Sequence, residues 1–177
     1  VDNSDDRFHC AELIDRDLQS LSIWAEWWLV TFSPGKTKSL TISNKCDANL
    51  NPQLILNNQA IEEVKSHLYL GITFSNSLKW GRHIDTVTRK ARKRLNMLLP
   101  LKFKLDRASL ETLYFSFVLP ILEYANVVWG GVYDCDSCKI EQIHIDAMRL
   151  ITGATARSNI SELYKETSWL STSDRLL

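Results

Sequence analysis

Apolar residues recur every three or four positions in two long stretches of the chain. The first stretch runs from Leu13 to Trp28, and the second runs from Leu78 to Pro100, where we expect it to end. This spacing places the apolar side chains on one face of an α-helix. The residues expected to pack inward are Ile14, Leu18, Leu21, Ala25 and Trp28 in the first helix, and Ile84, Val87, Ala91, Leu95 and Leu98 in the second.

Three further helices are predicted toward the C-terminus. Asp106 is a candidate N-cap for a helix whose apolar stripe continues to Val128, and Pro120 should kink or split that helix. Another helix should end near Gly153, and a short one should cover residues 161–167. The apolar positions of the two longer helices are Leu110, Leu113, Phe117, Ile121, Tyr124 and Val128, then Ile140, Ile143, Ala147 and Leu150.

The segment between the first two helices has a different pattern, in which short apolar runs alternate with polar residues. "KSLTIS" reads as a strand, and two short runs flank Asn57-Asn58, a pair suited to a hairpin turn. "HLYLGITF" alternates through Gly71 and predicts a half-buried strand with a close backbone approach at the glycine. The chain therefore has an α+β pattern that is mostly α, with residues 1–76 mixed and residues 77–177 all helical.

Charge is distributed unevenly along the chain, although its formal net value is zero. The segment from Lys79 to Arg107 holds ten Lys/Arg and two acidic residues. The segment before Val64 has five basic and ten acidic residues, and the one after Arg107 has five basic and nine acidic. A basic block of this density, placed directly after the strand "YLGITF", is a candidate polyanion-binding face. The plainer interpretation is a solvated helix face.

The N-terminus is polar and acidic, and no apolar run approaches the length of a membrane span. We therefore expect an intracellular protein without a signal peptide, in the nucleus or the cytoplasm, with its four cysteines reduced. No membrane partner is expected. No serine or cysteine nucleophile with a nearby base is recognisable, because the four histidines are scattered.

The stretch "FSPGKTK", residues 32–38, ends like a phosphate-binding loop. Such a loop needs a further glycine at the position of Val30, and it must run from a strand into a helix. Here the predicted order is helix, turn, strand, so we do not expect nucleotide cradling. The pair Asp5-Asp6 could suggest two-metal chemistry, but no hydrophobic strand precedes it, so a solvated acidic segment is favoured.

Cys135 and Cys138 have the spacing of zinc ligands, and His144 follows them. Structural zinc needs four ligands, and a second cysteine pair is missing because Cys46 is remote. His144 shares a helix with residues that should pack. We therefore predict no metal site in this chain.

Four stretches, in this order, resemble one known family. They are "LQSLSIWAEWWLVTFSPGKTKSLTIS", "YLGITFSNSLKWGRHIDTVTRKARKRLNML", "LETLYFSFVLPILEYANVVWGG" and "MRLITGATARSNISELYKETSWL". Together they resemble the C-terminal part of a reverse transcriptase from a non-LTR (LINE-type) retrotransposon of the jockey or CR1-like kind. The resemblance covers nearly the whole chain. It implies a remnant of the palm domain in residues 1–76 and a helical thumb in residues 77–177.

The resemblance also implies roles for individual residues. Lys36 matches a palm-motif lysine that assists nucleotide addition, with Ser33-Pro34 where the family often has Asn-Pro. The stretch from Tyr69 to Ile72 resembles the primer-grip hairpin, in which Tyr69, Leu70 and Gly71 would approach the primer. The thumb would hold nucleic-acid phosphates through its basic residues. These are Arg82, Arg89, Lys90, Arg92, Lys93 and Arg94.

Neither the catalytic aspartate of the first palm motif nor the family's Ala-Asp-Asp box has a match in this chain. The parent polymerase would use Mg²⁺, whereas this chain alone should bind no cofactor and should not polymerise. Its expected partners are an RNA template, an RNA–DNA or DNA primer duplex, and the missing fingers and palm. Two alternatives stay open. One is a non-catalytic nucleic-acid-binding module, and the other is a non-functional remnant of a mobile element with exposed apolar surface.

Overall fold

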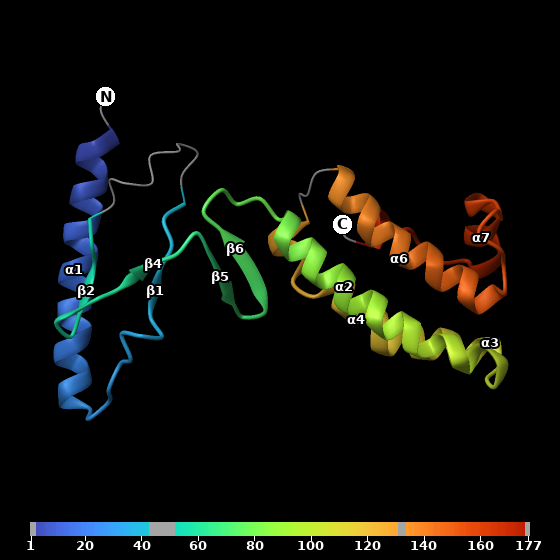
Figure 1. The fold of residues 1–177 in the computed structure, drawn as a ribbon, viewed down its shortest axis with the longest axis horizontal. Helices are drawn as coiled ribbons and strands as arrows, with labels where there is room; N and C mark the ends of the chain where they lie inside the picture. Colours follow the sequence, from blue (N-terminus) through green and yellow to red (C-terminus); the bar gives the residue numbers. More distant parts are fainter. Residues whose placement is uncertain (1–2, 43–51, 131–133, 176–177) are drawn as a thin grey trace. The chain divides into compact units, whose positions relative to one another are not determined.

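The structure is a computed structural model that describes residues 3–42, 52–130 and 134–175 (Figure 1). The chain forms two compact units, residues 1–79 and residues 80–177. The first contains one long helix and short strands, and the second contains only helices among its described residues. This content is compatible with the α+β prediction, while the assignment of the units as palm and thumb stays a prediction.

The first unit begins with helix α1 (Asn3–Trp27), followed by strand β1 (Lys38–Ser39). Strands β2 (Ile55–Leu56) and β3 (Gln59–Ala60) form an antiparallel hairpin, and β4 (Glu62–Glu63) pairs in parallel with β1. Both residues of the predicted Asn57-Asn58 turn have positive φ, 50° and 58°, as a two-residue hairpin loop requires. The hairpin is therefore confirmed. The predicted strand "KSLTIS" is shorter than expected, because only Lys38 and Ser39 pair.

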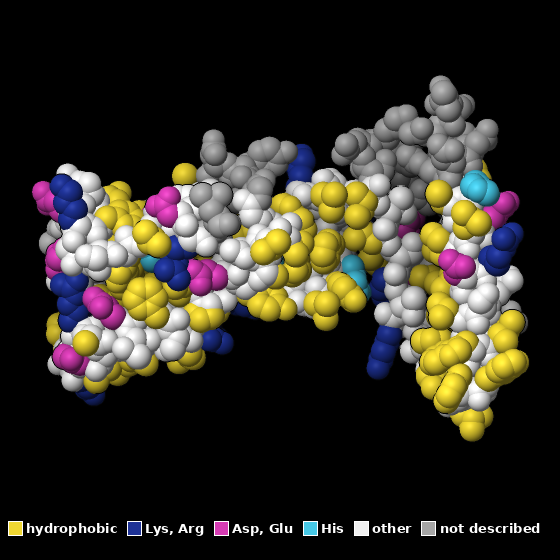
Figure 2. Space-filling view, turned by 180° about the vertical axis from the view of Figure 1, so that it is seen from behind, with side chains coloured by type: hydrophobic (Ala, Val, Ile, Leu, Met, Phe, Trp, Pro, Cys, Tyr) yellow, Lys and Arg dark blue, Asp and Glu magenta, His cyan; other side chains and the backbone are white. Residues whose placement is uncertain are grey.

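Helix α1 is confirmed, but only part of its predicted apolar stripe packs inward. Ala25 is buried and Leu18 is half-buried, whereas Ile14, Leu21 and Trp28 are 44%, 46% and 68% exposed. The strands of the first unit are too short to cover a whole helix face, and β2 packs against only part of α1. In Figure 2, hydrophobic side chains gather at the lower end of this unit.

The stretch "HLYLGITF" is a hairpin, so the prediction of one continuous strand from its alternation is wrong, whereas the resemblance had implied a hairpin at Tyr69 to Ile72. Strand β5 (Ser66–Tyr69) pairs antiparallel with β6 (Ile72–Ser75), and Tyr69 faces Ile72 across a two-residue loop. The loop residues Leu70 and Gly71 have φ values of 47° and 81°. Two consecutive positive φ angles reverse the chain with the twist that paired strands need. Alternation alone could not reveal this reversal, because Leu70 is an unusual residue for such a turn.

The second unit is a bundle in which α2 (Gly81–Leu98) packs against α4 (Leu119–Glu123) and α6 (Asp134–Thr152). The remaining elements are η1 (Leu99–Phe103), α3 (Arg107–Leu113), η2 (Tyr114–Val118), α5 (Asn126–Trp129), α7 (Ile160–Thr167) and α8 (Thr172–Arg175). All five apolar positions predicted for α2 and all four predicted for α6 are buried. Asp106 caps α3 by accepting a hydrogen bond from the backbone N–H of Ser109, at 3.3 Å.

The helix that contains Pro120 is split, as predicted, but its buried face differs from the prediction. Residues Tyr114–Val118 form a π turn, in which the N–H of Leu119 donates to the carbonyl of Tyr114. The proline ring would clash with the carbonyl four residues earlier in a regular α-helix, and the wider turn relieves that clash. A π turn holds an extra residue, so the inward face moves on by one position. Val118 and Leu122 are buried in place of Phe117 and Ile121.

A polar pair lies inside this core. The hydroxyl of Tyr114 lies 2.6 Å from Nδ1 of His144, and Nε2 of His144 lies 3.0 Å from the carbonyl oxygen of Leu170. Trp169 stacks on Tyr114 with ring centroids 4.9 Å apart. Burial lowers the pKa of His144 and raises the pKa of Tyr114. Both side chains are therefore neutral at pH 7, with their polar atoms satisfied.

Candidate nucleic-acid interface

The solvent face of α2 carries a row of basic side chains. Arg82, Arg89 and Lys93 follow one another at spacings of seven and four residues, which places them on one line of the helix. All three are exposed, and Lys90, also exposed, flanks the row. The row lies opposite the buried face of α2, whose packing against α4 and α6 fixes the direction in which the cations point. Arg89, Lys90 and Lys93 form no ion pair with any described residue.

Arg92 is turned toward α6 and away from this row. Its Nη1 donates to Oδ2 of Asp146, a half-buried carboxylate that also accepts from Nε2 of Gln142 at 2.8 Å. The pair joins two helices of the bundle and neutralises the charge of Arg92. Arg92 therefore contributes to the packing of α2 on α6 more than to a free basic surface.

Arg94 also has a partner within the bundle. Its Nη1 donates to the carbonyl oxygen of Phe117 at 3.0 Å, and its guanidinium carbon lies 4.3 Å from the centroid of the Phe117 ring. The hydrogen bond and the cation–π contact together fix this side chain against the π turn η2. The side chain remains exposed, so its charge still adds to the field of the basic face.

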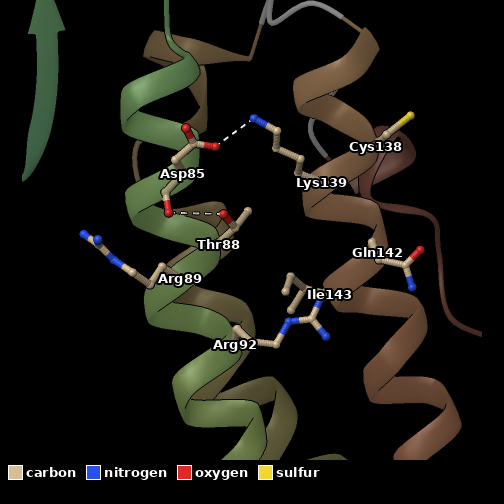
Figure 3. Close-up of a pocket in the computed structure, with 8 residues that line it drawn as sticks. All are labelled: Asp85, Thr88, Arg89, Arg92, Cys138, Lys139, Gln142 and Ile143. Carbon is tan, nitrogen blue, oxygen red and sulfur yellow. Dashed lines mark hydrogen bonds and ion pairs between the residues drawn. The ribbon is translucent and has the colours of Figure 1, made fainter.

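A cleft of about 530 Å³ lies between α2 and α6 (Figure 3). Lys139 donates to Asp85 at 2.7 Å and to Asp136 at 3.0 Å, and these two hydrogen bonds raise the pKa of Lys139. Carboxylates thus compensate Lys139 here as Asp146 compensates Arg92. Figure 3 shows the guanidinium of Arg89 on the side of α2 away from α6. The uncompensated charge therefore faces solvent and not the cleft.

The buried side of α2 contributes one titratable group, His83. Burial lowers the pKa of this histidine, and the positive charge of Lys90 lowers it further. The His83 ring lies 5.8 Å from the ring of Trp129, centroid to centroid. His83 is therefore neutral at pH 7 and adds no charge to the basic row.

Lys36 lies in an exposed turn of the first unit. The turn follows α1 and precedes β1, which confirms the order helix, turn, strand and excludes a phosphate-binding loop of the strand-to-helix kind. The backbone N–H of Lys36 donates to the carbonyl of Ser33 at 3.1 Å, and the hydroxyl of Thr37 donates to the same oxygen at 3.0 Å. Lys38 is paired with Glu62, whereas Lys36 forms no ion pair with a described residue.

Tyr69, Leu70 and Gly71 form the tip of the β5–β6 hairpin, also in the first unit. Tyr69 and Leu70 are 61% and 71% exposed. The tip thus presents an aromatic ring and an aliphatic side chain to solvent, next to a glycine that permits close backbone approach. The structure brings these three residues together, and it brings the six predicted basic residues together on α2.

Three curated proteins resemble the chain in sequence. It is 29% identical over 140 residues to the RNA-directed DNA polymerase from mobile element jockey of Drosophila melanogaster, a match that covers 77% of this chain and 15% of that protein. It is 28% identical over 141 residues to the probable RNA-directed DNA polymerase from transposon BS of the same species, with 76% and 15% covered. The jockey polymerase of Drosophila funebris is 29% identical over 140 residues, again with 77% and 15% covered.

The chain contains a region related to the reverse transcriptases of non-LTR retrotransposons. The resemblance predicted from the sequence is thereby confirmed. This reverse-transcriptase-related region spans about 15% of the length of the curated relatives it matches. No known protein-family model matches it, and no solved structure matches it.

The predictions about metal ligands involve several residues that the structure does not fully describe. The side chains of Asp5, Asp6 and Cys135 and the whole of Cys46 lie outside the described residues. Cys138 is exposed, and both ring nitrogens of His144 already have hydrogen-bonding partners. Among the described residues, no three His, Cys, Asp or Glu side chains are grouped so that they could hold a metal ion. None of the described helices is long and apolar enough to cross a membrane.

Sequence reasoning missed several residues that shape this surface. Asp146 binds Arg92, and Glu141 accepts hydrogen bonds from Tyr164 and Thr172. Residue spacing gives no signal for such contacts, because each partner lies on another element. Phe103 was also missed, although its place between Lys102 and Lys104 is visible in the sequence.

Proposed function

We propose that this chain is a piece of a retrotransposon reverse transcriptase that holds template–primer nucleic acid by its phosphates through α2. The observation that carries the proposal is the row of exposed basic residues on one line of α2. Two members of this row, Arg89 and Lys93, form no ion pair with a described residue. The relatives support it in general terms, since their names describe RNA-directed DNA polymerases.

The geometry of α2 suits a phosphate backbone. From Arg82 to Lys93 the helix rises about 16 Å at 1.5 Å per residue, which is enough to follow several phosphates of one strand. Contacts from Lys and Arg to phosphate are independent of sequence, and they weaken as the salt concentration rises, because the counterions that binding releases then gain less entropy. We therefore expect weak, salt-sensitive binding with little sequence preference.

Catalysis needs more than this chain supplies. Lys36, exposed and without an ion pair to a described residue, would act as a charge partner for the triphosphate while negative charge builds on the leaving group. Mg²⁺ in the parent polymerase would need carboxylates of an Ala-Asp-Asp type that the sequence does not match. We propose that the 177-residue chain alone does not extend a primer. Extension by the purified chain with Mg²⁺ and deoxynucleoside triphosphates would refute this.

The binding function is tested by equilibrium titration of the chain against a labelled RNA–DNA duplex over a range of salt concentrations. Binding that weakens steeply with salt supports the proposal. Binding that is absent at low salt, or that does not depend on salt, contradicts it. The second candidate, a binding module without a catalytic partner, shares this interface. The two candidates are distinguished by adding the catalytic palm segment of a related polymerase as a separate chain. Primer extension by the mixture supports the polymerase piece, and its absence supports the binding module.

A further inference from the structure

Phe103 is an exposed aromatic side chain at the end of η1, just beyond the basic helix α2. It is 88% exposed, which is unusual for a side chain of this size in a packed bundle. Two lysines flank it in the sequence, and Nζ of Lys102 lies 6.0 Å from the centroid of its ring. Lys104, on the other side, is exposed. The ring therefore lies in a positively charged part of the surface.

The direction of Phe103 follows from the helix that precedes it. Leu98 is buried and Leu101 packs against the core, and these residues are three apart. Residues three apart eclipse in a 3₁₀ helix, so Pro100 and Phe103 share another side, and both are exposed. Met97, three residues before Pro100, is 57% exposed. The exposed row of α2 therefore continues without a break through Arg89, Lys93, Met97, Pro100 and Phe103.

This row changes in chemistry along its length. Its first part is cationic and its last part is apolar and aromatic, with lysines beside the aromatic ring. A partner protein with an apolar patch would gain from the ring but would have to accommodate the lysines. A nucleic-acid strand complements both parts, because its phosphates pair with cations and every base offers a π-face.

We propose that Phe103 stacks on an unpaired base of a nucleic-acid strand whose phosphates lie along α2. The ligand is a single-stranded segment, either free or extending from a duplex. Arg89 and Phe103 are separated by roughly 24 Å along the axis of α2 and η1, which corresponds to about seven stacked nucleotides at 3.4 Å each. This inference rests on the proposed function and adds to it a preference for single-stranded ends.

The test uses fluorescence anisotropy of the full 177-residue chain with three probes. These are a labelled single-stranded thymidine oligonucleotide, the same strand with abasic sites, and a blunt duplex of equal length. Phe103→Ala should weaken binding of the intact single strand about fivefold or more, since stacking on an aromatic side chain contributes on that scale. Its binding of the blunt duplex and of the abasic strand should be unchanged. Phe103→Trp should bind the single strand as well as the parent chain.

Val127→Ala is the matched control, because Val127 is 95% exposed on the same unit and lies outside the basic row. Equal weakening on all three probes would overturn the stacking proposal, as would single-strand binding by Phe103→Leu that equals that of the parent chain. Loss of self-association by Phe103→Ala without any change in single-strand affinity would assign the ring to a protein contact and also overturn it. Failure of the proposed function looks different, because the parent chain would then bind none of the probes.

Discussion

Arg92 of α2 is paired with Asp146 of α6 at the contact where these two helices pack. This places one of the six basic residues of α2 in a structural role. Among the exposed cations of α2, Arg89, Lys90 and Lys93 form no ion pair with a described residue, whereas Arg94 is held by Phe117. The two groups should respond differently to mutation.

Arg92→Gln should lower stability and leave nucleic-acid affinity nearly unchanged. Removing a partly exposed ion pair costs about 0.5–1 kcal/mol of unfolding free energy. Thermal melting followed by circular dichroism measures this loss, with Arg89→Gln as the control that should melt like the parent chain. A drop in the salt dependence of binding for Arg92→Gln, with an unchanged melting temperature, would show that Arg92 belongs to the interface after all.

The stability of the chain should fall as the pH is lowered from about 6.5 toward 5. Burial lowers the pKa of both His144 and His83 below the ordinary value of 6.5, so in this range the unfolded chain binds protons that the folded chain does not. The lowered pKa of Asp106 acts only at lower pH, because its ordinary value is 3.8. Melting temperatures at pH 7.5, 6.5 and 5.5 check this, and a constant or rising melting temperature toward pH 5.5 would contradict it.

Tyr114→Phe should lower the free energy of unfolding more than a substitution that removes an exposed tyrosine hydroxyl. The change leaves Nδ1 of His144 without its hydrogen-bonding partner inside the core, which costs about 1–3 kcal/mol. Tyr69→Phe is the matched control, since Tyr69 is exposed at the hairpin tip. Denaturant titration of both variants measures the difference. Equal free energies of unfolding would show that the buried pair contributes nothing.

Leu70→Asn should stabilise the β5–β6 hairpin. Leu70 has a φ of 47°, a conformation that asparagine tolerates better, and Asn-Gly is the favoured pair for this turn. We expect a gain of about 1 kcal/mol, seen as slower amide hydrogen exchange in the hairpin strands. If Leu70 also contacts the primer, the variant should bind nucleic acid more weakly while its hairpin is more protected. Faster exchange would contradict the turn geometry.

The exposed apolar end of α1 should make the isolated chain self-associate. Trp27, Trp28 and Leu29 are 83%, 68% and 94% exposed and lie next to one another. Trp27→Gln with Trp28→Gln should shift the sedimentation profile toward monomer, whereas Val127→Ala should not. A parent chain that is monomeric and melts sharply would contradict this prediction.

The features that could be predicted from the sequence depend on residues close together in the chain. Those that could not be predicted depend on contacts between distant elements. The buried faces of α2 and α6 follow from helical periodicity within each helix. The inward face beyond Tyr114 could not be read from periodicity, because the π turn before Pro120 shifts it by one residue. The pairing of Arg92 with Asp146 joins residues 54 positions apart and has no local signature.

For the candidate site, the number of Lys and Arg residues along the sequence predicted the basic block. The sequence did not predict which of these cations are free on the surface and which are paired. Partner contacts decide that division, and they come from α6 and η2. The incomplete packing of the predicted α1 stripe has a related origin. Periodicity identifies the apolar face of a helix, but it cannot say whether this chain contains the surface that covers it.

The most direct test compares two double variants that lower the net charge equally. Arg89→Gln/Lys93→Gln removes two cations from the basic row, and Arg157→Gln/Lys165→Gln removes two exposed cations elsewhere on the same unit. Affinity for a duplex is measured against salt concentration. The first variant should lose about 1.8 from the slope of log K against log salt, at about 0.9 per phosphate contact, and the second should keep the parent slope. Equal slopes for the two variants would contradict nucleic-acid binding through α2.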